Sequence, residues 1–192
     1  MLLTVRQYGD PVLRQRGAAI TAFDKALANY ARDLHETMKA NEGIGLASQQ
    51  VGQARRIFVA DLQSRTSEAE KIMLDGKPVP AALLMPLFAV NPELAYLPGE
   101  KRDAEEGCLS FPEIRGKVNR PWAVQLRYQD LQGKPHVLET SGLFARVIQH
   151  EFDHVEGVLF IDRMDAKYVQ SLDAELKKLK KQGKAAAAKL VK

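Results

Sequence analysis

The chain has 192 residues, 45% hydrophobic and 27% charged, which is typical of one soluble globular domain with a sizeable core. No stretch approaches the roughly 18 apolar residues of a membrane span, and the first residues lack the basic and apolar regions of a signal peptide. The single cysteine, Cys108, excludes an internal disulfide. We therefore expect a cytoplasmic protein without a membrane segment.

The net charge of +4 is unevenly distributed along the chain. Residues 177–192 contain seven lysines and no acidic residue, which leaves 21 basic side chains against 24 acidic ones elsewhere. The body of the chain is therefore mildly acidic and is not expected to bind DNA.

In chain order, the first predicted element is a helix over residues 24–40. Its apolar face follows helical spacing and is formed by Leu27, Tyr30, Ala31, Leu34 and Met38. His35 is expected at the solvated edge of this helix. The next segment, EGIGLASQQVG over residues 42–52, is too rich in glycine to predict regular structure.

Strands are predicted further along the chain, at residues 55–61, at 87–94 as far as Pro92, and at 122–129. The last of these continues through a turn into 135–140 as a hairpin. Residues 62–86 are first polar and then proline-bearing, which indicates a long loop or a hairpin with an insertion.

A second long helix is predicted over residues 142–156, with Ser141 as its N-cap and Gly157 as its stop. Residues 158–162 favour a short strand. A final amphipathic helix carries Val169, Leu172, Leu176 and Leu179. Strands and helices do not alternate regularly, so we predict an α+β fold. Antiparallel or mixed sheets should pack around a buried central helix, with one helix at each end of the chain.

The central helix contains the pattern HEFDH, residues 150–154. His150 and His154 are four residues apart, so they share one helical face and can bind one metal ion. Glu151 projects about 100° away from His150, which suits a general acid or base acting on water. The alternative is a structural helix whose histidines only form hydrogen bonds. Apolar residues surround most of this helix, and this favours the metal site because buried polar groups need partners.

Two histidines hold a metal poorly, and Cys108 in EEGCLSFPEIRG is a candidate third ligand. A thiolate and two imidazoles leave the fourth tetrahedral position to water, as in catalytic sites. The alternative is a small buried residue on a strand. From these residues alone, both interpretations stay open.

Three ordered segments, GIGLASQQ (43–50), EEGCLS (105–110) and QHEFDH (149–154), resemble the signature motifs of the peptide deformylases. The pattern departs once, with Ser48 where alanine is usual. The resemblance covers about residues 2–165.

This resemblance implies metal ligation by Cys108, His150 and His154, with one Fe(II) per chain and zinc, nickel or cobalt as replacements. It implies that Glu151 carries the proton. The Gln50 side-chain amide and the Leu109 backbone N–H would then form an oxyanion hole.

The resemblance also implies a substrate peptide that adds a strand beside Gly43, Ile44 and Gly45. Arg115 would contact this peptide; the alternative is an ordinary surface arginine. An apolar methionine pocket is expected from Ile44, Phe111, Val147 and Ile148. Two further acidic residues are given supporting roles: Glu106 would anchor the loop before Cys108, and Asp153 would orient a ligand.

The implied function is a metal-dependent hydrolase that removes the N-formyl group from the formyl-methionine of new polypeptides and releases formate. The alternatives are a zinc endopeptidase sharing HExxH and a non-catalytic structural metal domain, which would need four protein ligands. We expect a catalytic domain over 1–165. The basic helix and tail over 166–192 would belong to this domain or form an appendage, and would contact the ribosome. We expect a monomer.

Overall fold

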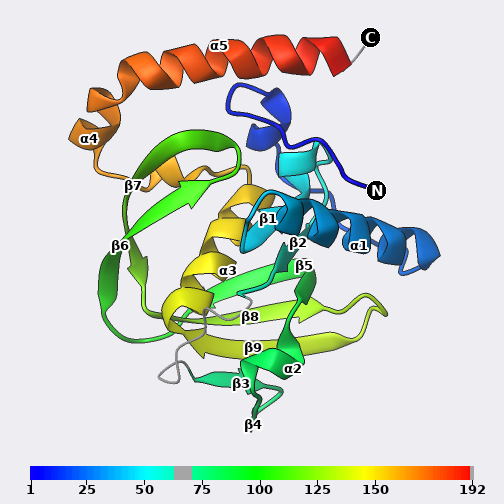
Figure 1. Ribbon diagram of the computed structural model, residues 1–192. Coiled ribbons are helices and arrows are strands. Elements are labelled where there is room, and N and C mark those ends of the chain that lie inside the picture. Colours follow the sequence, from blue (N-terminus) through cyan, green and yellow to red (C-terminus); the bar gives the residue numbers. More distant parts are fainter. Residues whose placement is uncertain (63–70, 191–192) are drawn as a thin grey trace.

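The computed structural model describes residues 1–62 and 71–190, and its longest buried helix is enclosed by β-structure (Figure 1). The larger sheet has the strand order β1-β2-β5-β8-β9-β3-β4, with antiparallel neighbours. Its strands are β1 (Gly45–Ala47), β2 (Ile57–Ala60), β3 (Ile72–Leu74), β4 (Lys77–Pro78), β5 (Leu87–Tyr96), β8 (Ala123–Gln129) and β9 (Pro135–Ser141). A separate antiparallel hairpin consists of β6 (Lys101–Cys108) and β7 (Phe111–Pro121).

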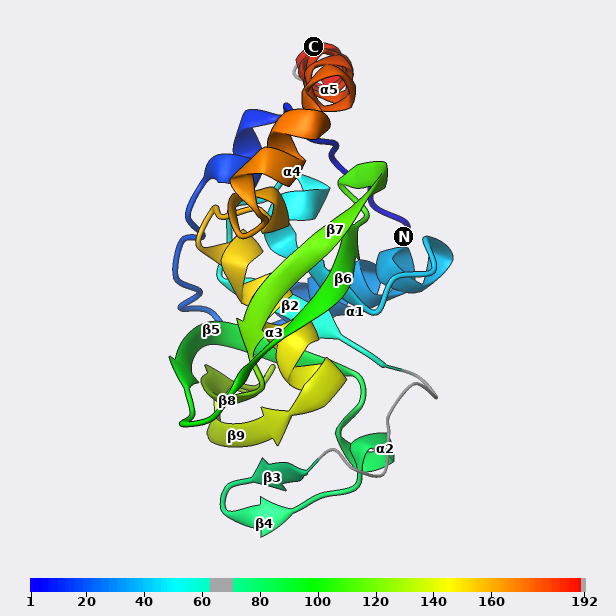
Figure 2. The same ribbon diagram turned by 90° about the vertical axis from the view of Figure 1, so that its left-hand side faces the viewer.

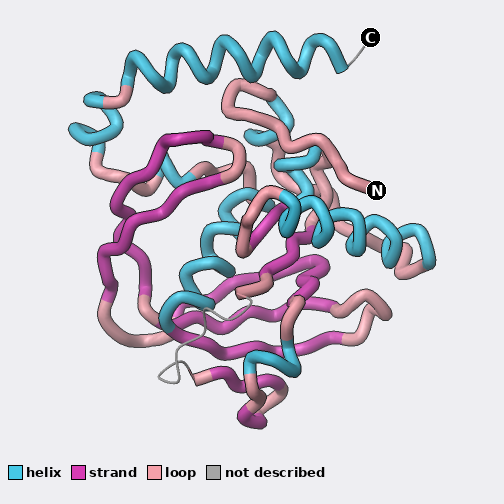
Figure 3. The backbone as a smooth tube through the Cα atoms, in the orientation of Figure 1, coloured by secondary structure: helices cyan, strands magenta, loops and turns pink. Residues whose placement is uncertain are grey.

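Helical segments, cyan in Figure 3, lie on several sides of these strands. They are η1 (Pro11–Arg14), α1 (Lys25–Ala40), η2 (Ser48–Val51), α2 (Ala81–Leu84), α3 (Gly142–Val155), η3 (Phe160–Asp162), α4 (Ala166–Ser171) and α5 (Asp173–Leu190). Of these, α3 lies between the larger sheet and the hairpin (Figure 1). The predicted α+β class is confirmed. In both ribbon views α5 lies at one end of the molecule and β3–β4 at the other (Figures 1 and 2).

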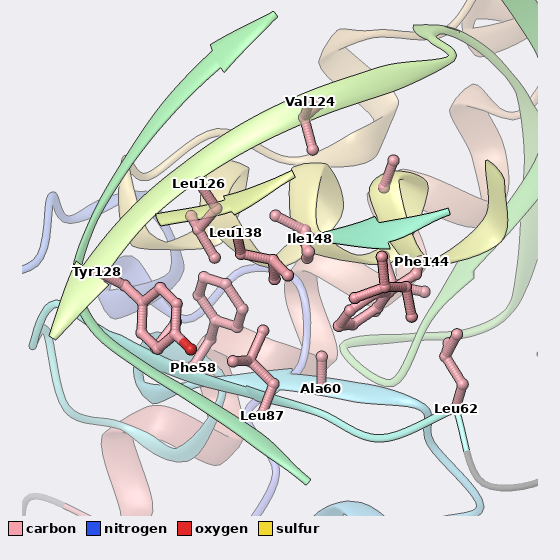
Figure 4. Close-up of a cluster of buried hydrophobic side chains, with 14 of the residues drawn as sticks. Phe58, Ala60, Leu62, Leu87, Val124, Leu126, Tyr128, Leu138, Phe144 and Ile148 are labelled. Carbon is pink, nitrogen blue, oxygen red and sulfur yellow. The ribbon is translucent and has the colours of Figure 1, made fainter. Parts of the chain in front are cut away.

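The main hydrophobic core lies between the larger sheet and α3 (Figure 4). Phe58 of β2, Leu126 of β8 and Leu138 of β9 contribute from the sheet, and Phe144 and Ile148 contribute from α3. All five are fully buried, and each stabilises the fold by about 1.5–3 kcal/mol through removal of apolar surface from water. This packing fixes the position of α3 and directs its polar side toward the β6–β7 hairpin.

A second core cluster joins the hairpin to both ends of the chain. Phe111 of β7 stacks on Tyr8 at a ring-centroid distance of 4.7 Å and meets Phe160 of η3 edge to face. Leu176 and Leu179 of α5 are buried in the same cluster. The apolar face of the last helix is therefore packed against the body of the protein.

The predicted helix over 24–40 is confirmed as α1, and Asp24 caps it by accepting a hydrogen bond from the Leu27 N–H. The expected solvated position of His35 is wrong. Its side chain is 15% exposed, and its Nε2 lies 2.8 Å from the Asp61 carboxylate.

The glycine-rich segment is more regular than predicted, because it forms β1 and then η2. Pairing with β2 supplies partners for the β1 backbone, which local composition does not reveal. The strand predicted at 87–94 also continues beyond Pro92, to Tyr96. A bulge makes this possible: Asn91 adopts a left-handed φ of 49°, and the register shifts between Val90 and Glu93.

The insertion at 62–86 contains the β3–β4 hairpin and α2, in agreement with the hairpin alternative. Residues 63–70 of that prediction lie outside the described residues. The strand and hairpin predicted at 122–129 and 135–140 are confirmed as β8 and β9.

The predicted helix over 142–156 is confirmed as α3, but the Ser141 side chain makes no capping hydrogen bond. The strand predicted at 158–162 is wrong, because η3 forms there. Leu159, Phe160 and Ile161 are buried in succession, whereas a strand with one solvated face would alternate. The final helix is divided into α4 and α5 at Leu172. No helix in the described part of the chain is long and apolar enough to cross a membrane.

Candidate metal centre

The structure brings Cys108, His150 and His154 together between the hairpin and α3. One ligand atom of each lies within 4.8 Å of the others. Cys108 Sγ is 3.2 Å from His154 Nε2, and the two imidazole rings meet edge to face with centroids 5.0 Å apart. A thiolate with two imidazoles is a donor set that suits zinc and other first-row divalent ions. The three residues therefore fit a metal ion.

Cys108 reaches this position because the hairpin ends irregularly. The β6–β7 register shifts between Gly107 and Cys108, and Leu109 and Ser110 form the turn. The two histidines come from α3, whose four-residue spacing places both rings on one face.

Glu106 supports His150 directly. Its Oε2 lies 3.0 Å from His150 Nδ1, and such a partner leaves Nε2 for a metal. Burial alone would raise the pKa of Glu106, but hydrogen bonds from His150 and Arg120 hold that pKa well below its usual value. Burial lowers the pKa of His154, which favours the neutral imidazole.

Glu151 is buried beside the three candidate ligands, and its Oε2 has no hydrogen-bond partner among the described residues. Burial raises the pKa of this carboxyl group to about 7. A group that titrates near neutrality can both accept and donate a proton. The buried position of Glu151 and its raised pKa therefore suit proton transfer.

Gln50 points its amide toward the same place. Its Oε1 accepts from the Ala47 N–H at 2.7 Å, while its Nε2 donates to Cys108 Sγ at 3.3 Å and to Ser110 Oγ at 3.5 Å. The carbonyl end is thus occupied by the backbone, and the donor end faces the candidate metal centre. Leu109 lies in the neighbouring turn.

A cleft of about 570 Å³ opens in front of these groups. Its walls include residues from the segment before β1, the hairpin and α3. Among them are the predicted Gly43, Ile44, Gly45, Gln50, Cys108, Leu109, Phe111, Arg115, Val147, His150 and Glu151. Ile114 and Leu143 were not predicted and also line it. The prediction for Ile148 is wrong, because this residue is buried in the core under the sheet (Figure 4).

Arg115 lies at the rim, where its side chain is 64% exposed and pairs with Glu105 at 2.7 Å. The β1 strand forms one edge of the larger sheet, so one of its sides has no neighbouring strand in that sheet. This edge borders the cleft through Gly45.

Asp153 forms no direct hydrogen bond to a candidate ligand among the described residues. It accepts instead from Arg120 and Arg163, and Glu106 is the carboxylate that reaches a histidine. Sequence reasoning missed Arg120 altogether. The spacing in the sequence could have indicated it. Ile114, Val118 and Arg120 are separated by even numbers of residues, so in a strand their side chains point to the same, buried face.

Replacement of Gly45 by alanine is expected to displace the Glu151 carboxylate, and displacements near 1 Å at a catalytic group lower rates by about 100-fold. A Cβ at this position would overlap the Glu151 carboxylate, chiefly its Oε1. Steady-state kinetics with metal-loaded protein would measure the effect, and the melting temperature would show whether the fold is retained. A folded variant with unchanged kcat would contradict this prediction.

Comparisons with known proteins agree on one family. The sequence model of the family described as polypeptide deformylase matches residues 2–170. The chain is 50% identical over 191 residues to the peptide deformylase of Opitutus terrae, with 97% of each chain covered.

Solved structures give the same result. The crystal structure of peptide deformylase from Thermotoga maritima matches with a TM-score of 0.72 at 39% identity, covering 86% of this chain and 99% of that one. Peptide deformylase from Plasmodium falciparum matches with a TM-score of 0.79 at 34% identity, covering 95% and 98%. The matched residues include all three candidate metal ligands.

Proposed function

The chain belongs to the polypeptide deformylase family, and from this membership we propose how its own residues carry out the reaction. As a member, it is a hydrolase that removes the N-formyl group from new polypeptides. The zinc endopeptidase alternative is not favoured, because the family model and the solved structures agree on deformylases. The observation that carries the residue-level proposal is the cluster of three ligand atoms beside Glu151 and Gln50.

The proposed metal ligands are Cys108 Sγ and one ring nitrogen each of His150 and His154. Their mutual distances and the Glu106 contact to His150 support this assignment. When bound, the ion supplies Lewis acidity to the attacking water and to the formyl oxygen. We propose one Fe(II) per chain, with zinc, nickel or cobalt as replacements; metal analysis of anaerobically purified protein tests this choice. The structural-metal alternative needs a fourth protein ligand, and the cluster found among the described residues has three.

Glu151 is proposed as the proton carrier. Its carboxylate takes a proton from the water that attacks the formyl carbon, and gives a proton to the amine nitrogen as the C–N bond breaks. The pKa near 7 that burial gives this group supports both transfers. The products are formate and a peptide with a free N-terminal methionine.

Gln50 and Leu109 are proposed as the donors that stabilise the oxyanion. The Gln50 Nε2 already lies at the candidate metal centre, and the Ala47 N–H holds its carbonyl end away. Leu109 directly follows Cys108, so its backbone N–H is a second donor beside the same site. Preorganised donors of this kind are each worth roughly 10²–10³ in kcat.

The substrate peptide is proposed to add a strand along the free edge at Gly43, Ile44 and Gly45, with Arg115 as a further contact at the rim. Main-chain pairing tolerates varied side chains, which suits an enzyme that acts on many different chains. Apolar residues of the cleft, among them Ile44, Phe111 and Val147, would receive the methionine side chain.

Formate release from formyl-Met-Ala by metal-loaded protein tests the activity, with acetyl-Met-Ala as the matched control. Only the formyl peptide should react, because the acetyl group is larger by one methyl than the formyl group that the site is proposed to admit. If the metal-loaded protein released no formate, the proposal would be overturned. Cleavage of internal peptide bonds would instead support the endopeptidase alternative.

Residues 1–165 are proposed to form the catalytic domain. The segment 166–192 belongs to the same domain, and the burial of Leu176 and Leu179 against the hairpin cluster supports this choice over a loose appendage. We propose that the enzyme acts as a monomer in the cytoplasm.

The exposed lysines of α5 are proposed to contact ribosomal RNA. Replacement of Lys178, Lys181 and Lys184 by glutamate should abolish co-sedimentation with ribosomes, because lysine contacts to RNA phosphates would be replaced by repulsion. These side chains are exposed, whereas the buried Leu176 and Leu179 stay in place. Formate release from free peptides should not change. Equal co-sedimentation of the variant and the parent at low salt would refute the contact.

A further inference from the structure

Buried charged side chains join the β6–β7 hairpin to α3 beside the candidate metal centre. Arg120 of β7, whose side chain is 4% exposed, donates from Nε and Nη2 to the two carboxylate oxygens of Glu106, at 2.6 and 2.9 Å. Its Nη1 donates to Asp153 Oδ2 of α3 at 2.8 Å. One guanidinium group therefore holds carboxylates from two separate elements.

Each carboxylate also has a second arginine. Arg146 donates to Glu106 Oε1 at 2.8 Å, and Arg163 donates to Asp153 Oδ1 at 2.8 Å. Neutralisation of Glu106 and Asp153 is thus shared with Arg146 and Arg163. The distinctive contribution of Arg120 is that it connects the two carboxylates in a fixed geometry, because its planar fork can donate in several directions at once.

Both carboxylates lie close to candidate metal ligands. Glu106 precedes Cys108 by two residues in β6 and also accepts from His150 Nδ1. Asp153 directly precedes His154 in α3. A guanidinium that clamps Glu106 and Asp153 therefore restrains the strand that carries the thiol, the helix that carries both imidazoles, and the orientation of one of those imidazoles.

We propose that Arg120 is a positioning residue of the metal centre, which sets the separation between Cys108 and the two histidines by clamping Glu106 to Asp153. The inference rests on the proposed Cys108, His150 and His154 site. Loss of an outer partner of a metal-binding histidine commonly costs 10–100-fold in metal affinity or activity. An effect of that size is expected here, although the hydrogen bonds of Arg120 go to Glu106 and Asp153 and not to the candidate ligands.

The test compares Arg120→Lys with Arg163→Lys. Each change keeps the positive charge and removes the planar fork next to Asp153, but Arg163 does not contact Glu106 and is 44% exposed. Metal-free full-length proteins would be titrated with cobalt(II) alone, and the dissociation constant and visible absorption spectrum recorded. Arg120→Lys should raise the dissociation constant by about 10–100-fold and shift the bands that report thiolate and imidazole geometry. Arg163→Lys should match the parent in both.

Kinetics of the cobalt-loaded proteins give a second measurement. Arg120→Lys should lower kcat for formyl-Met-Ala and leave KM unchanged, because the displaced groups act on the reacting atoms and the peptide-binding edge is intact. A general loss of stability would not shift the spectrum of the folded, loaded fraction.

Failure of the proposed metal site and failure of the positioning role of Arg120 give different results. A parent protein whose cobalt spectrum shows no thiolate ligation would overturn the proposed metal site itself. A parent with normal ligation, together with an Arg120→Lys variant that has the same dissociation constant and spectrum, would overturn the positioning role alone. Circular dichroism checks folding. If Arg120→Lys does not fold, the double variant Arg120→Gln/Asp153→Asn, which removes one charge of each sign and leaves the Glu106 contact to His150 in place, is judged by the same criteria.

Discussion

Replacement of Cys108 by serine is expected to lower formate release by at least about 10³-fold. Each factor of ten corresponds to 1.36 kcal/mol in the activation barrier, and the Lewis acidity supplied through this site is worth several kcal/mol. Serine has nearly the same size as cysteine, but its hydroxyl is not readily deprotonated to an anionic ligand. The loss should therefore come from the metal and leave the fold intact.

Metal removal provides the matched control for this variant. Parent protein stripped with a chelator should be as inactive as Cys108→Ser, and metal should restore the parent but not the variant. Metal content after dialysis and activity after reloading would measure both effects. A serine variant that retains stoichiometric metal and normal activity would remove Cys108 from the ligand set.

Replacement of Glu151 by glutamine should lower kcat by about 10²–10⁴-fold, the range expected for loss of a positioned acid or base. The amide has the shape of the carboxyl group but cannot carry the proton between water and amine. Metal binding should be retained, because Glu151 lies outside the cluster of three ligand atoms. KM should change little, since the peptide would bind along the edge at Gly45.

The free energy of unfolding of the Glu151→Gln variant shows whether a loss of activity comes from lost catalysis or from lost folded protein. Glu151 is buried with an Oε2 that has no partner among the described residues, so a neutral amide should not lower the free energy of unfolding. Urea denaturation of the metal-loaded variant would measure this. Full activity in a folded, metal-loaded Glu151→Gln protein would refute the proton-carrier role.

Local periodicity accounts for most of the fold that could be predicted. Leu27, Leu34 and Met38 marked α1 because helical spacing is a property of neighbouring residues. The apolar surroundings of HEFDH marked α3 as buried for the same reason. The four-residue spacing of His150 and His154 likewise placed both rings on one face before any tertiary contact was known.

Local patterns failed where long-range pairing decided the structure. Residues 101–108 are mostly charged and lack an alternating apolar pattern, so the β6–β7 hairpin was not predicted, although Ile114 and Val118 point to the same face of β7. The glycine-rich segment became β1 only through pairing with β2. Residues 158–162 carry strand-forming side chains, but their successive burial against the hairpin requires η3.

The sequence by itself determined that a thiol, two imidazoles and a neighbouring carboxyl group are present in ordered motifs that resemble those of one family. Only the tertiary structure decided which charged groups support them, because a buried charge takes its partner from whatever element folds against it. Glu106 and Arg120 come from one hairpin and Asp153 from α3. Their pairing depends on how the hairpin packs on α3, and no spacing along the chain encodes that contact.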